Sequence, residues 1–405
     1  MPCIPKVRLS FLTDNLWHRP HSVCGLTFLE RKMSLSNIKP MIKESHHIIL
    51  ADDGDICIGE IPGVSQIINN PPAWVRSALE KMDGKRTVPR IFKELINEGV
   101  QLKSECLDAF VASLAERKLL QDNAFFSNSL SGQEIERYNR QILQFSLIDA
   151  DNQHSFVYQE RLKQSKIAIF GMGGWGTWCA LQLTMAGVGA LRLIDGDDVE
   201  LSNINRQVLY RTDDVGKNKV DAARETLMAY NENVNVETFC EFASSDKGRL
   251  EELIGDSTFI ILAWAALGYY RKDTAEEIIH NIAKEKAIPV IELGGDPLEI
   301  SVGPIYLNDG IQSNFEDIKD LVKNKYYDSD YDIRKFQEAR LKHSFIDGER
   351  KVNAWQSAPS LSIMAGIVTD QVIKIITGYD KPHLIGKKFI LSLQNFNVRE
   401  EVICK

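Results

Sequence analysis

A cluster of glycines in the middle of the chain is the part best suited to chemistry. It comprises Gly171, Gly173, Gly174 and Gly176. The glycines follow a short apolar run, from Lys166 to Phe170, that predicts a buried strand, and an apolar stretch after them predicts a helix. Such glycines let the backbone turn tightly and approach a phosphate, while the amides at the start of the helix attract negative charge. The pattern therefore predicts a phosphate-binding turn.

An acidic residue follows at the spacing that a nucleotide site requires. Leu191 to Ile194 predicts a second strand, which ends at Asp195, roughly 20 residues beyond the glycines. A carboxylate at this position usually accepts hydrogen bonds from ribose hydroxyls. On the glycines and Asp195 alone, a dehydrogenase that binds a dinucleotide is as good an interpretation as any other nucleotide enzyme.

The polar segment after Asp195 favours a triphosphate over a dinucleotide. Its side chains are Asp197, Asn203, Asn205, Arg206, Gln207, Lys217 and Lys219. A dinucleotide site needs little cationic help, whereas the charge of a triphosphate must be neutralised while its α-phosphorus is attacked. We assign this role to Arg206 and Lys219, and solvated surface cations are the alternative.

The combined pattern, DxDxVExSNxNRQ followed by VGKxK, resembles the E1-like adenylating enzymes, the group of ThiF, MoeB and the ubiquitin activators. Members of this family have a Rossmann-like α/β domain and use ATP to adenylate carboxyl groups. The resemblance implies that Arg206 binds the β- and γ-phosphates, that Lys219 stabilises charge at the α-phosphate, and that Asp195 holds the ribose. The remaining site residues would cradle the nucleotide or orient the loop around it. They are Gly171, Gly173, Gly174, Gly176, Asp197, Asn203 and Gln207.

A second stretch, EIERYNRQILQF from Glu134 to Phe145, resembles the helix that precedes the nucleotide domain in this family. The resemblance implies that Arg140 reaches from one subunit to the ATP phosphates of the other, as an arginine finger does. It therefore implies a homodimer. A surface salt bridge is the alternative role for Arg140.

The metal site departs from the family pattern. Family members hold magnesium with an aspartate that follows a strand corresponding to 258–263 here, but this chain continues with Trp264 and Ala265. We assign no metal ligand, and Asp197, Glu292 and Asp296 are weak candidates. The chain also lacks the cysteine pairs that bind zinc in some relatives. We therefore expect ATP and Mg²⁺ as cofactors and no zinc.

Further strands and helices must surround the nucleotide. Apolar patterns predict helices at 218–230 and 358–377 and strands at 234–239, 258–263, 288–293, 298–306 and 387–395. The charged stretch from Asn308 to Lys351 predicts either a loop near the substrate or a solvated surface.

The region from His46 to Leu120 predicts a small separate domain. HHIILADDGDICIGEI indicates two strands joined by a turn at Asp53 and Gly54, and three amphipathic helices follow. This winged-helix pattern resembles the PqqD-like domains that recognise leader peptides. The resemblance implies that an extended peptide adds to an open strand edge beside a helix. A nucleic-acid-binding winged helix and a structural cap are the alternatives.

The organisation predicted from these features is a tail or arm (1–45), a leader-recognition domain (46–121), a linker (122–133) and an adenylation domain (134–405). The formal net charge of -8 argues against nucleic acid or anionic lipid as a partner. The cysteines are dispersed, with no CxxC pair, which favours the reducing cytoplasm. No apolar run approaches the roughly 18 residues of a membrane span.

A leader-binding domain joined to an adenylating domain resembles the enzymes that mature ribosomally made peptides. The absence of zinc cysteines favours the pantocin A type over the microcin C type. That resemblance implies ATP-dependent activation of glutamate side chains in a precursor peptide, followed by ring closure, in antibiotic biosynthesis. The alternatives are adenylation of a peptide C-terminus, activation of a ubiquitin-like or sulfur-carrier protein, a nicotinamide oxidoreductase, and a peptide-binding scaffold without activity.

Overall fold

A computed structural model describes residues 37–264, 275–295, 298–312, 314–316, 335 and 356–403. The chain divides into two compact units, which we describe separately. Unit 1 comprises Met1–Glu160 and Thr377–Asp380, and unit 2 comprises Arg161–Ile376 and Lys381–Lys405. The division falls inside one helix, α6 (Ser155–Gln164), rather than in the 122–133 segment that we predicted as the linker.

Unit 2 is built on one eight-stranded sheet with the order β13-β12-β11-β10-β9-β6-β7-β8. The strands are β6 (Lys166–Phe170), β7 (Ala190–Ile194), β8 (Asn235–Phe239), β9 (Phe259–Leu262), β10 (Val290–Gly295), β11 (Glu299–Tyr306), β12 (Lys387–Ser392) and β13 (Val398–Val402). The run from β10 to β8 is parallel, and β11, β12 and β13 add to it in antiparallel fashion. The carboxyl ends of β6, β7 and β9 therefore lie at one edge, where open α/β sheets bind ligands.

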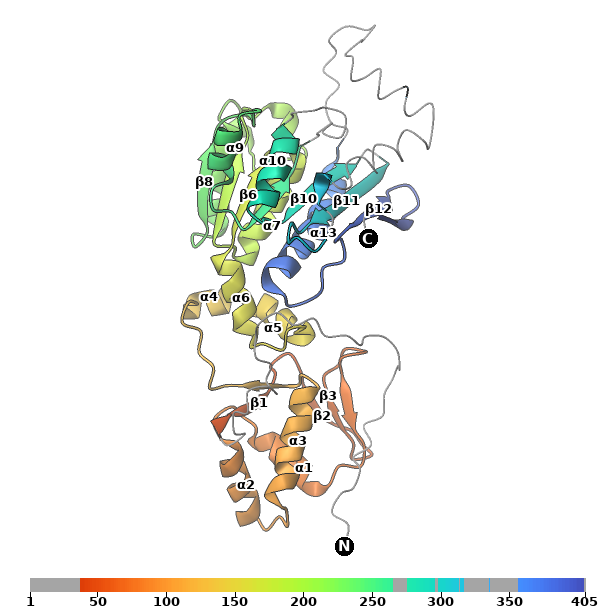
Figure 1. Cartoon of the computed structure of the whole chain (residues 1–405). Helices are drawn as coiled ribbons and strands as arrows, with labels where there is room; N and C mark the ends of the chain where they lie inside the picture. Colours follow the sequence, from red (N-terminus) through yellow and green to blue (C-terminus); the bar gives the residue numbers. More distant parts are fainter. Residues whose placement is uncertain are drawn as a thin grey trace. The chain divides into compact units, whose positions relative to one another are not determined.

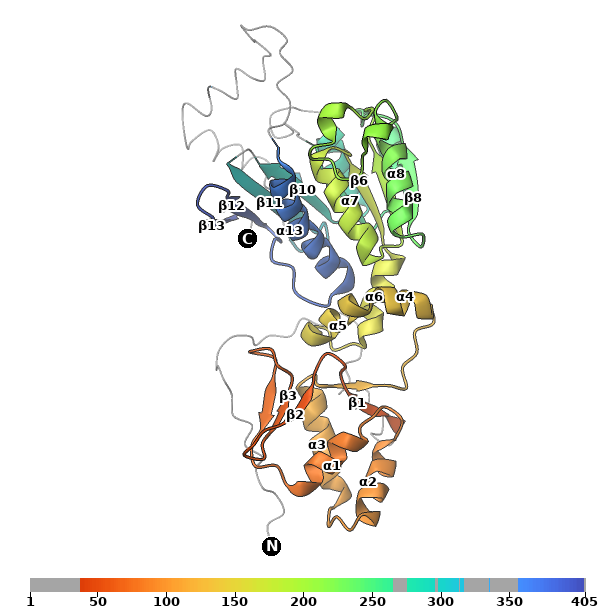
Figure 2. The same cartoon turned by 180° about the vertical axis from the view of Figure 1, so that it is seen from behind.

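Helices cover both faces of this sheet (Figures 1 and 2). One face packs against α7 (Gly174–Ala186), α8 (Lys219–Tyr230) and α13 (Ala358–Thr377), and the other against α9 (Lys247–Ile254) and α10 (Ala275–Glu285). Strands buried on both faces are apolar at every position, and all of β9 is buried. This three-layer arrangement confirms the predicted Rossmann-like α/β fold.

The helix α13 is long and apolar enough to cross a membrane by length and composition alone. Its side chains Leu361, Met364 and Val368 are buried in the core that α7 also lines. Thr369 Oγ1 donates to Gln182 Oε1 of α7 at 2.6 Å. We therefore interpret α13 as a core helix of unit 2.

Unit 1 contains a small α+β module. Its three-stranded antiparallel sheet has the order β2-β3-β4, and a separate ladder pairs β1 with β5. The elements are β1 (Pro40–Ile42), β2 (Ile48–Leu50), β3 (Ile56–Ile58), β4 (Gln66–Ile68), α1 (Ala73–Lys81), α2 (Val88–Asn97), α3 (Ser104–Glu116) and β5 (Leu120–Asp122). The hairpin expected around Gly54 is present between β2 and β3, and this glycine has a φ of +89°.

The ladder of β1 and β5 crosses the predicted limits of this module. β1 lies within the 1–45 segment that we expected to be a tail or arm, and Met41 pairs with Gln121. Ile38 and Ile42 are buried in the same core as the three helices. The described part of that segment thus belongs to the module. Three residues that begin with a proline carry too little periodicity to predict such a strand.

A buried ion pair joins the module to the helices that follow it in unit 1, which are α4 (Gly132–Arg137), α5 (Asn139–Ile148) and α6. Lys43 Nζ lies 2.6 Å from Asp149 Oδ2, directly after α5, and donates to Ser146 O at 3.0 Å. Tyr158 of α6 donates its hydroxyl to the other carboxylate oxygen. Burial lowers the pKa of Lys43, although Asp149 acts in the opposite direction.

Candidate functional site

The glycine cluster forms the turn between β6 and α7. Gly171 has a φ of +96°, and a Cβ at this position would lie 2.8 Å from the carbonyl oxygen of Ala263, just after β9. A Cβ at Gly176 would overlap the carbonyl oxygen of Gly171 itself. Both positions require glycine, because the first turn of α7 passes directly over the end of the sheet.

The next two glycines differ in how closely they are packed. Gly173 is the N-cap of α7, and the nearest atom to a Cβ there would be Gln207 Nε2 at 3.9 Å. At Gly174 a Cβ would overlap the side-chain oxygen of Gln356. The first amides of a helix have no intrahelical acceptor and point out of its N-terminus. The start of α7 therefore has the polarity of a phosphate site, with room beside Gly173.

The carboxylate of Asp195 supports the glycine turn. Its Oδ2 accepts from the Met172 N–H at 2.6 Å, and its Oδ1 accepts from the Asp197 N–H at 2.9 Å. The buried hydroxyl of Tyr210 donates to the Met172 carbonyl at 2.7 Å. Burial raises the pKa of Asp195, while the Asp197 amide and the charge of Lys219 oppose that rise. Each carboxylate oxygen keeps a second lone pair that a ligand hydroxyl can use.

The ammonium group of Lys219 is fixed next to this carboxylate. Lys219 begins α8, and its side chain is only 7% exposed. Its Nζ lies 2.7 Å from Asp197 Oδ2, and its backbone N–H donates to the Asp197 carbonyl at 3.0 Å. The neighbouring Lys217 points elsewhere, with its Nζ 2.9 Å from Asp214 Oδ1. Of the two lysines in VGKNKV, Lys219 alone contacts an acidic residue of the predicted site.

The loop from Leu201 to Gln207 places the remaining predicted residues. Asn203 closes a short 3₁₀ turn, in which its Oδ1 accepts from the Glu200 N–H at 3.0 Å. Trp178 of α7 donates from Nε1 to the Arg206 carbonyl at 3.0 Å, so the loop is tied to the helix that follows the glycines. Gln207 is buried, and among the described residues its Oε1 has no hydrogen-bond partner.

The guanidinium group of Arg206 bonds to its own loop. Its Nη1 donates to the Ser202 carbonyl at 2.6 Å and to Asn205 Oδ1 at 3.2 Å. Its Nε is buried and, within the described part of the chain, unpaired. The structure thus brings the backbone of Arg206 to α7 without directing its charged group at the glycine turn. Arg140 lies on α5 in unit 1, and its predicted role toward the nucleotide stays a prediction.

Three site residues carried no recognisable signal in the sequence. Tyr210 fixes Met172, Trp178 fixes the Arg206 loop, and Gln356 packs against the start of α7. The two aromatic residues have the composition of any core, and Gln356 is too distant in the sequence for spacing to associate it with Gly174. Only a three-dimensional arrangement assigns them to the site.

These residues fit a nucleotide triphosphate. The start of α7 supplies helix N-terminal amides, and Lys219 supplies a fixed positive charge. A ligand hydroxyl or amine could donate to the buried Gln207 Oε1, and a ligand oxygen could accept from the buried Arg206 Nε. The magnesium candidates fit less well, because Asp197 is paired with Lys219 and Glu292 Oε1 lies 2.8 Å from a histidine nitrogen. Magnesium prefers several oxygen ligands. Ala265 and Asp296 lie outside the described residues.

Two solved structures, PaaA and MccB, have a fold similar to that of this chain. The crystal structure of PaaA is 74% identical to this chain with a TM-score of 0.73, and the match covers 90% of this chain and 100% of that one. A crystal structure of Escherichia coli MccB with MccA-N7isoASN is 19% identical with a TM-score of 0.67, and the match covers 90% and 97% of the two chains. At that identity the second match shows a shared fold.

Curated relatives match over a shorter length. The heterocyst HesA protein of Trichormus variabilis is 33% identical over 171 residues, which are 42% of this chain and 58% of HesA. The molybdopterin-synthase adenylyltransferase of Haemophilus influenzae is 42% identical over 125 residues, which are 31% of this chain and 48% of that enzyme. The chain thus spans about half the length of these relatives.

Matches to two protein families together cover most of the chain. Residues 45–104 match the PaaA-like N-terminal domain, and residues 138–404 match the ThiF family. The second match includes the glycine turn, Asp195, Arg206 and Lys219. The chain therefore belongs to the ThiF family, as its motifs predicted, and carries a PaaA-like domain before the ThiF region.

Proposed function

We propose that this chain is an ATP-dependent adenylating enzyme that activates carboxylates of a ribosomally made precursor peptide. The observation that carries the proposal is the glycine turn at the start of α7, braced by Asp195, with the ammonium of Lys219 fixed beside it. Membership in the ThiF family supports the same activity.

Each residue of the site has a role in this proposal. The amides of the glycine turn bind phosphate oxygens, and Asp195 accepts hydrogen bonds from the ribose. Lys219 stabilises the negative charge on the α-phosphate oxygens when a carboxylate attacks the α-phosphorus and pyrophosphate leaves. Because Asp197 already holds the ammonium group, the site needs little reorganisation to provide this charge. Arg206 binds the β- and γ-phosphates after releasing its contacts to Ser202 and Asn205.

Cysteine chemistry is not needed for this reaction. Cys179 lies on α7 near the site, but it is fully buried, and burial raises the pKa of its thiol to about 12. A thiol with such a pKa is a poor nucleophile at neutral pH. The proposed enzyme therefore works by positioning and electrostatics, with AMP as the group that leaves the activated carboxyl.

The peptide is proposed to bind at the free edge of β4. This strand pairs only with β3 in the described chain, and Arg117, directly after α3, donates from Nη1 to Gln66 Oε1 of β4 at 3.1 Å. Its middle residue, Ile67, is 39% exposed. An extended leader can add there as a further strand. The PaaA-like match over 45–104 and crystal structures of MccB with MccA support a peptide as the partner.

The likeness to PaaA supports a proposal for the product class. We propose that glutamate side chains are activated and then close a ring, as part of antibiotic biosynthesis in the cytoplasm. Adenylation of a peptide C-terminus, as in the microcin C type, is the second candidate, and it is favoured by the shared fold with MccB. The two differ in the mass of the product.

One experiment tests the activity and separates these candidates. The protein is incubated with ATP, Mg²⁺ and the precursor peptide encoded next to its gene, and peptide masses and AMP are followed together. Loss of water from the peptide with release of AMP supports activation and ring closure. A peptide that retains a nucleotide mass supports the second candidate. An unaltered peptide with intact ATP refutes both.

The peptide edge is tested with a matched pair of exposed isoleucines. Ile67→Glu places a charge on β4, and Ile48→Glu places one on β2, the opposite edge, where Ile48 is 45% exposed. The first change should raise the KM for the peptide about tenfold with kcat retained, and the second should leave both constants near their original values. The reverse pattern would assign the peptide to β2.

The proposed dimer is tested by mixing two inactive variants. If Arg140 acts on the partner's nucleotide, an Arg140→Ala chain and a Lys219→Met chain together form some sites with both functional groups. Activity should return on mixing, and no return would assign Arg140 to its own subunit or to the surface.

A further inference from the structure

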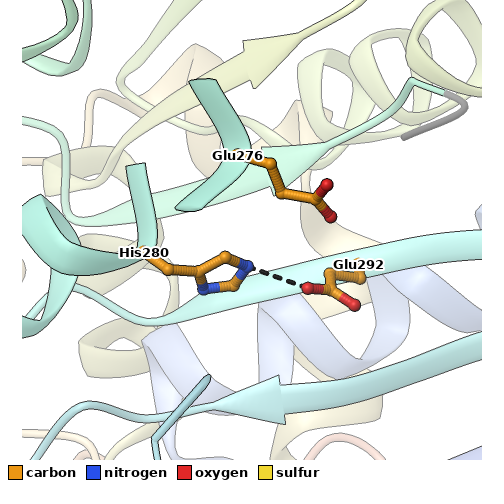
Figure 3. A group of neighbouring side chains, drawn as sticks. All are labelled: Glu276, His280 and Glu292. Atoms are coloured by element: carbon orange, nitrogen blue, oxygen red, sulfur yellow. Dashed lines mark hydrogen bonds and ion pairs between the residues drawn. The ribbon is translucent and has the colours of Figure 1, made fainter. Parts of the chain in front are cut away.

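A second group of ligand-type side chains lies between α10 and β10, in unit 2. Glu276 and His280 are four residues apart on α10 and therefore project from the same side of the helix. Glu292 lies on β10 and faces them (Figure 3). Its neighbours in the strand, Val290 and Ile291, belong to the cores on opposite faces of the sheet. Glu292 shares the face of Val290, which is opposite the face that packs against α7.

The three side chains are close enough to share one ion. One ligand atom from each residue lies within 4.8 Å of those of the other two. His280 Nε2 lies 2.8 Å from Glu292 Oε1. Two ligands with bonds of about 2.1 Å to the same metal lie at most about 4.2 Å apart. At tetrahedral angles such ligands lie about 3.4 Å apart, so the longest separation in the group must close by up to about 1.4 Å, which rotation of a glutamate side chain can provide.

All three residues have little contact with solvent. Glu276 is 6% exposed, His280 2% and Glu292 9%. The carboxylates of Glu276 and Glu292 lie close to each other as well as to His280, and two negative charges in one buried group repel each other. A divalent ion bound between them would balance both negative charges and leave the imidazole neutral.

The imidazole ring is also held in place before any ion binds. It stacks on Phe315 with ring centres 4.0 Å apart and planes within 5°, and Tyr306 meets it edge-on at 4.9 Å. Both aromatic side chains are buried. Phe315 and Tyr306 thus pack against the imidazole ring, and Nε2 of His280 faces the carboxylate of Glu292 (Figure 3). A preoriented histidine is a feature of built metal sites.

We propose that Glu276, His280 and Glu292 bind a divalent first-row metal ion. One imidazole and two carboxylates suit Mn²⁺, Fe²⁺ or Zn²⁺ better than Mg²⁺, which prefers oxygen ligands alone. These ligands differ from the four cysteines of the zinc-bearing relatives, and the ion would join α10 to β10. The proposal is independent of the adenylation activity.

Binding is measured on the full chain without ATP or peptide, after dialysis against a chelator. Mn²⁺ and Zn²⁺ are titrated separately, and bound metal is counted by elemental analysis after equilibrium dialysis. We expect one ion per chain and a higher thermal midpoint with metal than with chelator. His280→Gln should weaken binding by more than about 100-fold, because changes around a metal site that spare its ligands already cost 10- to 100-fold.

Two matched variants distinguish metal binding by these three residues from unspecific attraction of cations to the acidic residues of α10. Glu276→Gln keeps the size of the ligand and is expected to fold even if His280→Gln does not, while Glu277→Gln changes the adjacent, half-buried glutamate of α10. Binding should be lost in the first and kept in the second. Absence of a bound ion in the unmodified protein, or equal loss in both variants, would show that His280 and Glu292 form a hydrogen-bonded pair without a metal.

Discussion

Replacement of Lys219 with methionine should separate catalysis from stability. Methionine retains the apolar stem that is buried at this position, where the lysine side chain is 7% exposed. Its partner Asp197 is 53% exposed, so water can solvate the carboxylate once the ammonium is gone. The lost ion pair should therefore cost about 1 kcal/mol or less. For a unit of this size that corresponds to a fall in Tm of at most about 4 °C.

The effect on turnover should be far larger. A preorganised charge that stabilises a developing anion contributes about 10²- to 10³-fold in kcat, or about 2.7–4 kcal/mol. We expect Lys219→Met to lose that factor in the rate of AMP release with the precursor peptide present. The assay is AMP formation under saturating ATP, together with thermal melting of the same preparation.

Lys217→Met is the control, because it alters the other lysine of the same motif. Lys217 is 46% exposed, and its Nζ contacts Asp214 and Glu225 rather than the site. Its removal should change turnover less than about twofold, since exposed ion pairs contribute little. Equal losses in the two variants, or full turnover in Lys219→Met, would refute the assignment of Lys219 to the α-phosphate.

Three further outcomes follow from the described contacts. Gly176→Ala should lower the thermal midpoint and abolish ATP binding measured by calorimetry, whereas Gly173→Ala, which meets no close atom, should fold with an unchanged midpoint. Lys43→Met leaves the carboxylate of Asp149 buried without its cation, and denaturant unfolding should show a loss of about 3–5 kcal/mol; a loss below 1 kcal/mol would contradict this account. Burial lowers the pKa of His154 to about 4, so the unfolded chain binds the extra proton first, and stability should fall as pH drops from about 6.5 to 4. His154→Gln should flatten that fall, and an unchanged pH profile would show that other groups cause it.

Local sequence patterns were sufficient to predict the structure at the centre of the ThiF region. The glycines, the strands on either side of α7 and the acidic end of β7 each follow from spacing over fewer than about 30 residues. The close approach of Gly176 to the Gly171 carbonyl explains physically why glycine is needed there. The fold and the family are confirmed, whereas the roles of the individual site residues stay predictions.

Contacts between distant segments could not be predicted. The pairing of β1 with β5 joins residues some 80 positions apart, and neither strand is long enough to show a period. The motif around Arg206 does not predict that its guanidinium donates to the Ser202 carbonyl. The direction of this long side chain depends on which residues pack around it in the folded protein. Likewise, Glu292 is a magnesium candidate in the sequence, but its contact with His280 depends on how α10 packs against the sheet.

The contacts between the small module and the end of α5 restrict which other modules could replace it. Lys43 enters from the module, and the carboxylate it neutralises comes directly after the helix that carries Arg140. Lys118, also from the module, donates to the Asp149 carbonyl at 2.6 Å. A foreign N-terminal module grafted onto this enzyme must therefore bring a cation to the same position, or Asp149 after α5 must be replaced as well. Chimaeras that retain Asp149 without a matching lysine should be recovered as insoluble protein.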